Sequence, residues 1–450
     1  MTEDIETALQ KLKKGNAVGA DGISAENLHH AHPCLIVILK LLFNSMLKYG
    51  FVPDDFGKSI LIPLIKDSNA DTSSCENYRG ISLNCSISKV FEYVLLHKYS
   101  DCFKTHDLQF GFRNGVGCSD ALHTVKSVIN HFNKNGNTVT IAALDISKAF
   151  DRVSFYALLN KLILRKVPKE IIKVLYSWYT KNFMQIKWKN ELSEWFQVEA
   201  GVRQGGVLSP FLFAIYIEDV LLELKNKRKG CVIGGTYLGC ILYADDILLL
   251  SQSVTCLQSM LCICDDVGAR LDLKFNVKRS SVLRIGKRFN VSCCNLLLNN
   301  IVLPFVEEIK YLGVTIKRGL NFSRSTCSTK IKFYRSFNAV YSKAFFAPEE
   351  VLVNLFKFYC LPIITYACEA IPPSKSELKV LDKLIYTAFC KNFHTFDKDV
   401  IELSKFYFGL SSCSELLGVR QHNFLNRYHN KGFVFSNTIA CVNGVNLENL

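Results

Sequence analysis

The chain has 450 residues, of which 49% are hydrophobic and 21% are charged, so a disordered protein is excluded. Its net charge of +14 favours an anionic partner, with nucleic acid first among the candidates. The longest uninterrupted apolar run, FLFAIYI at residues 211–217, is too short to span a bilayer, so we expect no membrane association.

The 18 cysteines are scattered, with no C-x-x-C pair and no Cys/His cluster at zinc-site spacing. The first ten residues, MTEDIETALQ, are acidic and polar and do not resemble a secretory signal. These features predict free thiols in a reducing, intracellular compartment, either the nucleus or the cytoplasm. The sequence gives no indication of the oligomeric state.

The N-terminal third is predicted to be mainly helical, with one pair of strands. Apolar residues at helical spacing predict helices over residues 4–14, 25–50, 86–100 and 119–133. Residues 58–66 and 78–83 are typical of two strands, joined by the polar loop DSNADTSSCEN.

Strands and helices alternate in the middle of the chain. TVTIAALD, residues 138–145, predicts a buried strand that ends at Asp145. The later pattern predicts helices over 155–165, 168–182 and 254–271, a further helix from Ser209, and hairpins within 184–202 and 240–250. Residues 280–286 and 308–317 are each expected to form a strand, and the chain is mainly helical from about residue 325.

Two adjacent carboxylates interrupt the apolar stretch GCILYADDILLLSQS, residues 239–253. We expect Asp245 and Asp246 at the tip of a hairpin. Burial of adjacent carboxylates is unfavourable, so either this tip is an exposed turn or a cation is held there.

Asp145 ends a second apolar strand, where the simpler interpretation is a helix N-cap. If the two strand ends meet, their acids provide the oxygen ligands that Mg²⁺ prefers, and two such ions can stabilise both oxygens of a phosphoryl transfer.

The segment GVRQGGVLSPFLFAIYIEDVL, residues 201–221, combines a glycine pair with a helix start. Gly205 and Gly206 allow the backbone to approach a ligand closely. Ser209 and Pro210 suit the N-cap and the first helical position, so an ordinary loop before a helix is the alternative.

In this order, ALDISKAFDRV, RQGGVLSPFLF and YADD resemble motifs A, B and C of the reverse transcriptases of non-LTR (LINE-type) retrotransposons. Further blocks are similar to the family's other motifs: KGNAVGADGIS, IPLIKDSNADTSSCENYRGISL, LQFGFRNGVGCSDAL, EIKYLGVTI and FYCLPIITYACEAI. The resemblance is firmest over residues 11–318, and we expect a polymerase module without the family's endonuclease.

The resemblance implies an α/β (α+β) right-hand polymerase fold with fingers, a palm of antiparallel sheet and helices, and a helical thumb. The expected boundaries are residues 1–139 for the fingers, 140–318 for the palm with motifs A to E, and 319–450 for the thumb and C-terminal extension. The implied partners are an RNA template, a DNA primer and deoxynucleoside triphosphates, and the implied cofactor is two Mg²⁺ ions.

The resemblance also implies roles for individual residues. Asp145, Asp245 and Asp246 would be the catalytic and metal-binding acids, with Asp246 more a supporting group than a ligand of both ions. Phe150, five residues after Asp145, would lie under the incoming sugar and exclude a 2′-hydroxyl. Without the motif, a core aromatic would be the simpler interpretation of Phe150.

Four further residues are implied to bind the nucleotide. Gln204 and Gly205 would contact the nascent base pair, while Lys66 and Arg79 flank the fingers loop and would reach the triphosphate. Two solvated charges at the end of a hairpin are the alternative for Lys66 and Arg79.

The sequence departs from the family pattern at two places. Gly80 replaces the usual proline of the fingers block, and Arg279 occupies the lysine position of motif D, with Lys278 one residue earlier. Arginine is a poor proton donor because its guanidinium hardly deprotonates.

Two alternatives to a reverse transcriptase stay open. One is a catalytically silent nucleic-acid-binding protein on the same fold, which the truncated architecture and Arg279 favour. The other is an RNA-templated RNA polymerase or a maturase-type enzyme.

Overall fold

A computed structural model describes residues 1–66 and 71–443, so residues 67–70 of the predicted fingers loop and the last residues of the predicted C-terminal extension lie outside it. The chain divides into two compact units. Unit 1 comprises Met1–Phe112, Ile146–Glu223 and Ile263–Asn276, and unit 2 comprises Arg113–Asp145, Leu224–Cys262 and Val277–Leu450. This division does not test the predicted boundaries of fingers, palm and thumb, which stay a prediction.

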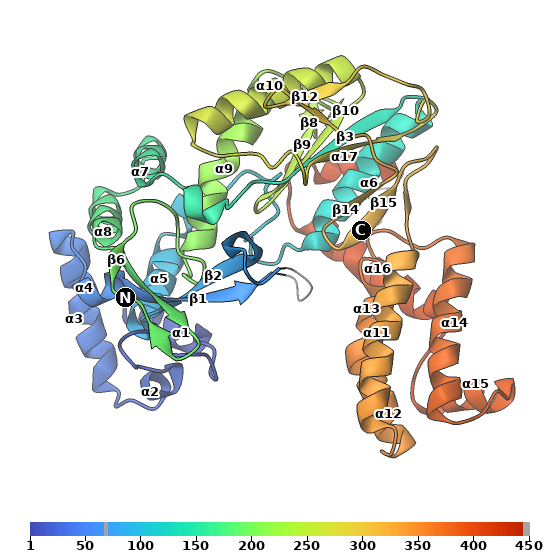
Figure 1. The fold of residues 1–450 in the computed structure, drawn as a ribbon, viewed down its shortest axis with the longest axis horizontal. Coiled ribbons are helices and arrows are strands. Elements are labelled where there is room, and N and C mark those ends of the chain that lie inside the picture. The colour runs from blue at the N-terminus through green and yellow to red at the C-terminus, as the bar shows by residue number, and fades with distance from the viewer. Residues whose placement is uncertain (67–70, 444–450) are drawn as a thin grey trace. The chain divides into compact units, whose positions relative to one another are not determined.

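Unit 1 combines helices with one five-stranded sheet (Figure 1). Its helices are α1 (Thr2–Lys11), α2 (Ala25–His29), α3 (Cys34–Tyr49), α4 (Asp54–Gly57), α5 (Ser86–Lys98), α7 (Phe155–Leu164) and α8 (Lys169–Thr180). Its strands are β1 (Lys58–Ile65), β2 (Tyr78–Asn84), β4 (Phe183–Trp188), β5 (Glu191–Leu192) and β6 (Phe196–Gln197). Two longer helices, α9 (Ser209–Asn226) and α10 (Val254–Arg270), contribute residues to both units.

The sheet of unit 1 is organised around β1. This strand pairs antiparallel with β2 along its whole length and parallel with β4 over its first four residues. Pro63 lies beyond the part of β1 that pairs with β4, where its missing N–H removes no bond to that strand. The predicted strands on either side of the polar loop therefore form a hairpin, as expected.

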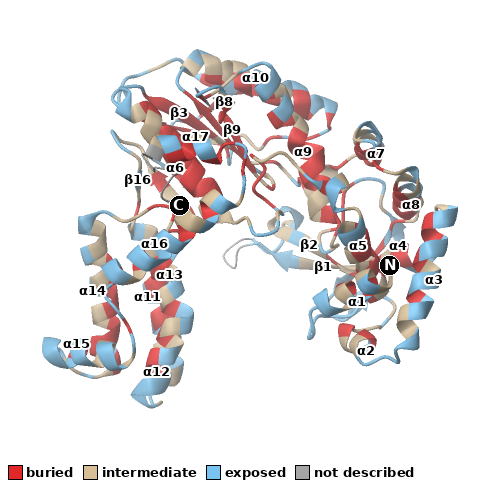
Figure 2. Ribbon diagram, turned by 180° about the vertical axis from the view of Figure 1, so that it is seen from behind, coloured by how far each residue is buried: buried red, intermediate tan, exposed pale blue. Residues whose placement is uncertain are grey.

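Unit 2 contains a four-stranded sheet in the order β11–β3–β10–β9. The strands are β3 (Val139–Leu144), β9 (Cys240–Tyr243), β10 (Asp246–Ser251) and β11 (Ser281–Ile285). Because β3 lies inside the sheet and α6 (Cys118–Lys134) packs on it, its apolar residues are buried almost without interruption. Figure 2 shows buried residues along β3, α6 and β9.

The remainder of unit 2 consists of short strands and a helical C-terminal region. The short strands are β7 (Val232–Ile233), β8 (Thr236–Tyr237), β12 (Leu296–Leu298), β13 (Ile301–Leu303), β14 (Glu308–Tyr311), β15 (Val314–Lys317) and β16 (Ser323–Arg324). The helices are α11 (Cys327–Ala344), α12 (Glu349–Leu355), α13 (Leu361–Thr365), α14 (Lys375–Asn392), α15 (Lys398–Tyr407), α16 (Cys413–Asn430) and α17 (Ser436–Asn443). The predominantly helical C-terminal region agrees with the sequence-based expectation. Phe333, Phe356 and Phe389 lie in its hydrophobic core.

Two predicted elements differ from the observed ones. The helix expected over residues 25–50 is divided into α2 and α3, because Pro33 lacks the N–H that would continue a helix through it. The single strand expected over 308–317 is two antiparallel strands, β14 and β15, which reverse direction at Leu312 and Gly313.

Two further expectations concern thiols and membranes. All 18 cysteines fall among the described residues, and each is a free thiol. Within the described part of the chain, no helix combines the length and the apolar character needed to cross a bilayer.

The close approach of α4 to the chain before β4 gives a stability test. A methyl group on Gly57 would lie 1.8 Å from the carbonyl oxygen of Lys181, whereas one on Gly418 of α16 meets nothing within 4 Å. We expect Gly57→Ala to lower the melting temperature, because backbone must move to accept the methyl group. Gly418→Ala should raise stability by about 0.5–1 kcal/mol through better helix propensity. Equal melting temperatures for the two variants, measured by circular dichroism, would contradict this packing.

Candidate active site

The paired ends of β3 and β10 bring acidic residues together in unit 2. Leu144, the last residue of β3, lies opposite Ile247 of β10 in an antiparallel register. Asp145 follows Leu144 and Asp246 precedes Ile247, so the two aspartates occupy neighbouring positions at the same end of the sheet. The structure therefore brings together the acids of motifs A and C, which are about 100 residues apart in the chain.

Asp245 lies in the tight turn between β9 and β10. Tyr243 pairs with Asp246, so the turn consists of Ala244 and Asp245 alone. The prediction of both acids at the hairpin tip was therefore wrong for Asp246, which is the first residue of β10. Ala244 adopts a φ of 56°, which is unfavourable for an L-residue with a side chain and marks a constrained turn.

The carboxylates affect one another electrostatically. Desolvation, followed by the negative charges of Asp245 and Asp145, raises the pKa of Asp246 to about 6. A bound cation would offset this repulsion, so the donor set fits a hard divalent ion in its chemistry. Among residues 1–66 and 71–443, however, no group of three or more His, Cys, Asp or Glu side chains is arranged as a metal site.

The motif D residues, Lys278 and Arg279, belong to unit 2, as the three aspartates do. Nη1 of Arg279 is 4.0 Å from Oδ2 of Asp145, and the backbone N–H of Asp145 donates to Oγ of Ser280 at 3.2 Å. Lys278 is exposed. Arg279 thus places a positive charge beside the strand-end aspartate, while the sequence alone suggested only a possible defect in proton transfer.

The remaining predicted site residues belong to unit 1, where Gln204 and Gly205 lie against β2. The backbone N–H of Ser82 donates to the carbonyl of Gln204 at 2.7 Å. A methyl group on Gly205 would lie 2.2 Å from the carbonyl oxygen of Ser82, and its φ of 139° also favours glycine. The glycine is required here for the close approach of two backbone segments.

Gln204 also lines a cavity of about 310 Å³ in unit 1, together with Gly80, Ser82 and Asp151. Its side-chain amide donates to Oδ1 of Asp151 at 3.2 Å. Desolvation raises the pKa of Asp151, and the hydrogen bond from Gln204 opposes this effect. Asp151 is a candidate that sequence reasoning missed, although it lies within motif A.

Phe150 is half-buried in a short 3₁₀ turn. Its ring stacks on Phe213 with centroids 4.8 Å apart and meets Phe112 edge-on at 6.2 Å. These contacts fix the ring orientation and leave part of it accessible, so both the core interpretation and the steric role remain physically consistent with its position.

Lys66 and Arg79 lie at the end of the β1–β2 hairpin. Arg79 is opposite Leu64, and Nζ of Lys66 donates to the carbonyl of Glu76 at 2.7 Å. Both side chains are exposed. The alternation of side chains along a strand places Arg79 on the face opposite that of Gly80, so the structure does not bring Arg79 to the Gln204 cavity.

A buried glutamate that sequence reasoning missed holds the motif B loop. Oε2 of Glu92 in α5 accepts hydrogen bonds from the backbone N–H groups of Val207 and, at 3.0 Å, Leu208. Burial raises the pKa of Glu92, and both amides and the nearby charge of Arg203 oppose this shift. Because the acceptor and the donors are more than 100 residues apart in the chain, the sequence carries no local signal for this interaction.

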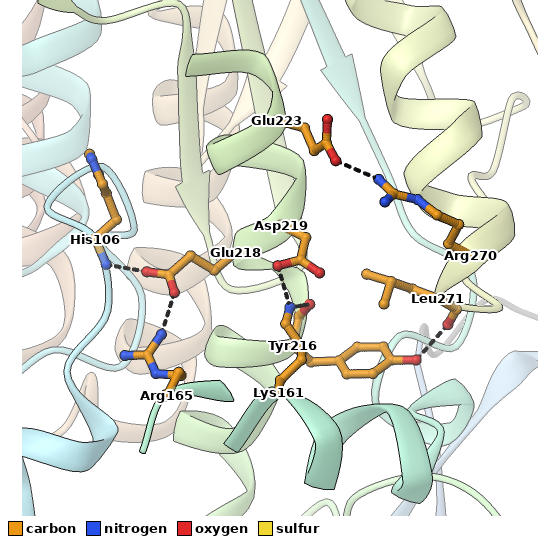
Figure 3. A network of polar contacts seen from close by, with 9 residues as sticks. All are labelled: His106, Lys161, Arg165, Tyr216, Glu218, Asp219, Glu223, Arg270 and Leu271. Carbon is orange, nitrogen blue, oxygen red and sulfur yellow. Dashed lines mark hydrogen bonds and ion pairs between the residues drawn. The ribbon is translucent and has the colours of Figure 1, made fainter. Parts of the chain in front are cut away.

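Helix α9, which follows the motif B loop, is held in place by polar contacts (Figure 3). Glu218 accepts from Arg165 at 2.5 Å and from the backbone of His106. Asp219 pairs with Lys161 at 2.9 Å, and the Tyr216 hydroxyl donates to the carbonyl of Leu271 at 2.6 Å. These bonds join the middle of α9 to Lys161 of α7, to Arg165 directly after α7 and to the loops at His106 and Leu271.

The chain matches a protein family over a continuous segment. The family described as "Reverse transcriptase (RNA-dependent DNA polymerase)" matches residues 65–316, which is more than half of the chain.

Similar proteins come from mobile elements. The chain is 26% identical to the "RNA-directed DNA polymerase from mobile element jockey" of Drosophila melanogaster, over 82% of this chain and 41% of that protein. It is 28% identical to the corresponding protein of Drosophila funebris, over 74% and 36%. A polyprotein of the R2 element of Nasonia vitripennis is 26% identical over 55% and 24%. The chain spans about two-fifths or less of the length of these relatives.

Solved structures of telomerase also resemble the chain. Telomerase from Candida tropicalis aligns with a TM-score of 0.41 and 13% identity, over 64% of this chain and 60% of that one. Telomerase from Candida albicans, in a complex with a fragment of telomeric RNA, aligns with a TM-score of 0.43 and 12% identity, over 90% and 66%.

The Glu92 interaction predicts a specific loss of stability. Glu92→Leu removes the acceptor of one buried and one part-buried amide, together with a compensating charge for Arg203, and should cost roughly 3–5 kcal/mol of unfolding free energy. Glu92→Gln keeps one acceptor and should cost less. Glu199→Leu, at an exposed position, is the control. Urea denaturation that shows the same loss for Glu92→Leu and Glu199→Leu would contradict the proposed support of motif B.

Proposed function

This chain belongs to the reverse transcriptase family, and we propose that it catalyses RNA-directed DNA synthesis by two-Mg²⁺ nucleotidyl transfer. The convergence of Asp145, Asp245 and Asp246 at one end of the unit 2 sheet is the observation that carries the proposal. The non-LTR retrotransposon relatives support the predicted type of reverse transcriptase. Residues 67–70 of the fingers block lie outside the described residues.

In the proposed reaction, the 3′-hydroxyl of a DNA primer attacks the α-phosphate of a deoxynucleoside triphosphate. The new bond joins the primer oxygen to that phosphorus, and the bond to the leaving pyrophosphate breaks. When bound, Mg²⁺ supplies charge stabilisation for the attacking and leaving oxygens. Asp145 and Asp245 would hold the ions, with Asp246 supporting them.

The other residues would position the substrates. Gln204 and Gly205 would contact the nascent base pair, and Phe150 would exclude a ribose 2′-hydroxyl. Lys66 and Arg79 would bind the triphosphate, because their exposed cations suit phosphate oxygens. RNA template, DNA primer and deoxynucleotides are accordingly the proposed partners, and the +14 net charge is consistent with them.

A silent nucleic-acid-binding protein is the second candidate. The observation that favours it is Arg279, which replaces the lysine of motif D and lies 4.0 Å from Asp145. An arginine there binds phosphate or carboxylate well but is a poor proton donor. The three aspartates favour catalysis over this alternative.

Primer extension tests the proposed activity. With an oligo-dT primer on an RNA template, Mg²⁺ and labelled deoxynucleotides, we expect the wild-type protein to extend the primer and Asp245→Asn to lose at least roughly 10³-fold in rate, as expected when a metal-positioning charge is lost. Asp266→Asn, at an exposed position on α10, should keep full activity. Full activity of Asp245→Asn would refute the site. Duplex binding without any extension by the wild type would favour the silent protein.

Sugar selectivity tests the role of Phe150. Phe150→Ala should incorporate ribonucleotides much more readily, because the bulk that contacts the 2′-position is removed. Phe150→Tyr keeps that bulk and should retain the wild-type preference. Single-nucleotide incorporation of dATP and ATP measures both. An unchanged preference in Phe150→Ala would assign this ring to packing against Phe213 alone.

A further inference from the structure

A buried arginine of unit 2 lies apart from the aspartates. Arg284 is in β11, the edge strand of the four-stranded sheet, opposite Thr140 of β3. Thr140 precedes Asp145 by five residues, which corresponds to about 16 Å along an extended strand. The surroundings of Arg284 are therefore distinct from the candidate active site.

Arg284 has few partners for a buried charge. The residue is only 8% exposed. Nη1 donates to the carbonyl of Val291, whereas the buried Nε–H has no hydrogen-bond partner. Among the described residues, no acidic side chain pairs with it. A guanidinium stays protonated, so burial without a counter-charge is unfavourable.

Arg284 lines a cavity of about 320 Å³. Phe289, Val291, Cys293 and Phe305 contribute mostly apolar walls. Val291 and Phe305 are 56% and 38% exposed, so these two walls reach the protein surface and allow access from solvent. The volume is in the range of small-ligand sites.

The second arginine at this cavity, Arg318, is already paired. It forms an ion pair with Glu307, and its Nε and Nη2 donate to the carbonyl of Phe289 at 3.1 Å and to Oδ1 of Asn290 at 3.0 Å. Arg318 therefore supports the cavity wall. The one uncompensated positive charge among the lining residues is that of Arg284.

We propose that this cavity binds a carboxylate carried on an apolar group. A guanidinium donates two parallel hydrogen bonds to a carboxylate, and the single free charge matches a monoanion better than a phosphate dianion. The apolar walls would cover the remainder of the ligand. Ligand binding at this cavity is separate from nucleotidyl transfer, so the proposal does not depend on the proposed catalytic activity.

Binding of benzoate tests the proposal, with benzamide as the uncharged analogue of the same shape. Isothermal titration calorimetry of the purified chain should show benzoate binding at least tenfold tighter than benzamide. Arg284→Met should weaken benzoate binding at least tenfold. Arg288→Met is the matched control, because Arg288 is exposed on the neighbouring loop and does not line the cavity, and it should bind benzoate normally.

A melting temperature, one further variant and one further probe complete the test. Arg284→Met should melt at the same or a higher temperature, since an unpaired buried charge is removed. Val291→Trp keeps the arginine and fills the cavity, so it should also abolish benzoate binding. If Arg284→Met does not fold, this variant tests whether the cavity is the binding site. No benzoate binding by the wild type, or equal weakening by Arg288→Met, would overturn the site. Tighter binding of phenyl phosphate would overturn the carboxylate assignment.

Discussion

Three carboxylates, those of Asp145, Asp245 and Asp246, lie together at one end of the unit 2 sheet, where their burial and mutual repulsion must be offset. Register between β3 and β10 places Asp145 beside Asp246, and the two-residue turn adds Asp245. Desolvation, followed by the negative charges of Asp245 and Asp145, raises the pKa of Asp246. Arg279 provides one counter-charge, 4.0 Å from Asp145. Such an arrangement is tolerated where a rigid sheet holds the backbone and a cation can be bound.

The same principle of a rigid support applies to the motif B loop in unit 1. Its glycine packs against the β2 backbone at Ser82, and Glu92 accepts hydrogen bonds from two of its amides. The helix that follows is fixed by ion pairs of Glu218 and Asp219. The residues that we propose to contact a substrate are thereby presented by segments whose positions are set by buried hydrogen bonds.

Local patterns in the sequence predicted most elements and the family, because apolar periodicity and ordered motifs are local signals. The strand ending at Asp145, the hairpin around Asp245 and the paired strands of residues 58–66 and 78–83 were all predictable in this way. The division of residues 308–317 into two strands was missed because polar and apolar residues alternate in both strands and only a short turn separates them. Glu92 and Arg284 could not be predicted, since their environments depend on tertiary contacts, and the register that moved Asp246 from the turn into β10 is set by strand pairing.

Thermal unfolding with and without Mg²⁺ tests most directly whether these aspartates form a cation site. Without Mg²⁺, Asp245→Asn should melt at a higher temperature than the wild type, because one repelling charge is gone. Added Mg²⁺ should raise the melting temperature of the wild type by binding the folded state, and should raise that of Asp245→Asn much less. Equal melting temperatures of the two proteins, unaffected by Mg²⁺, would contradict the account.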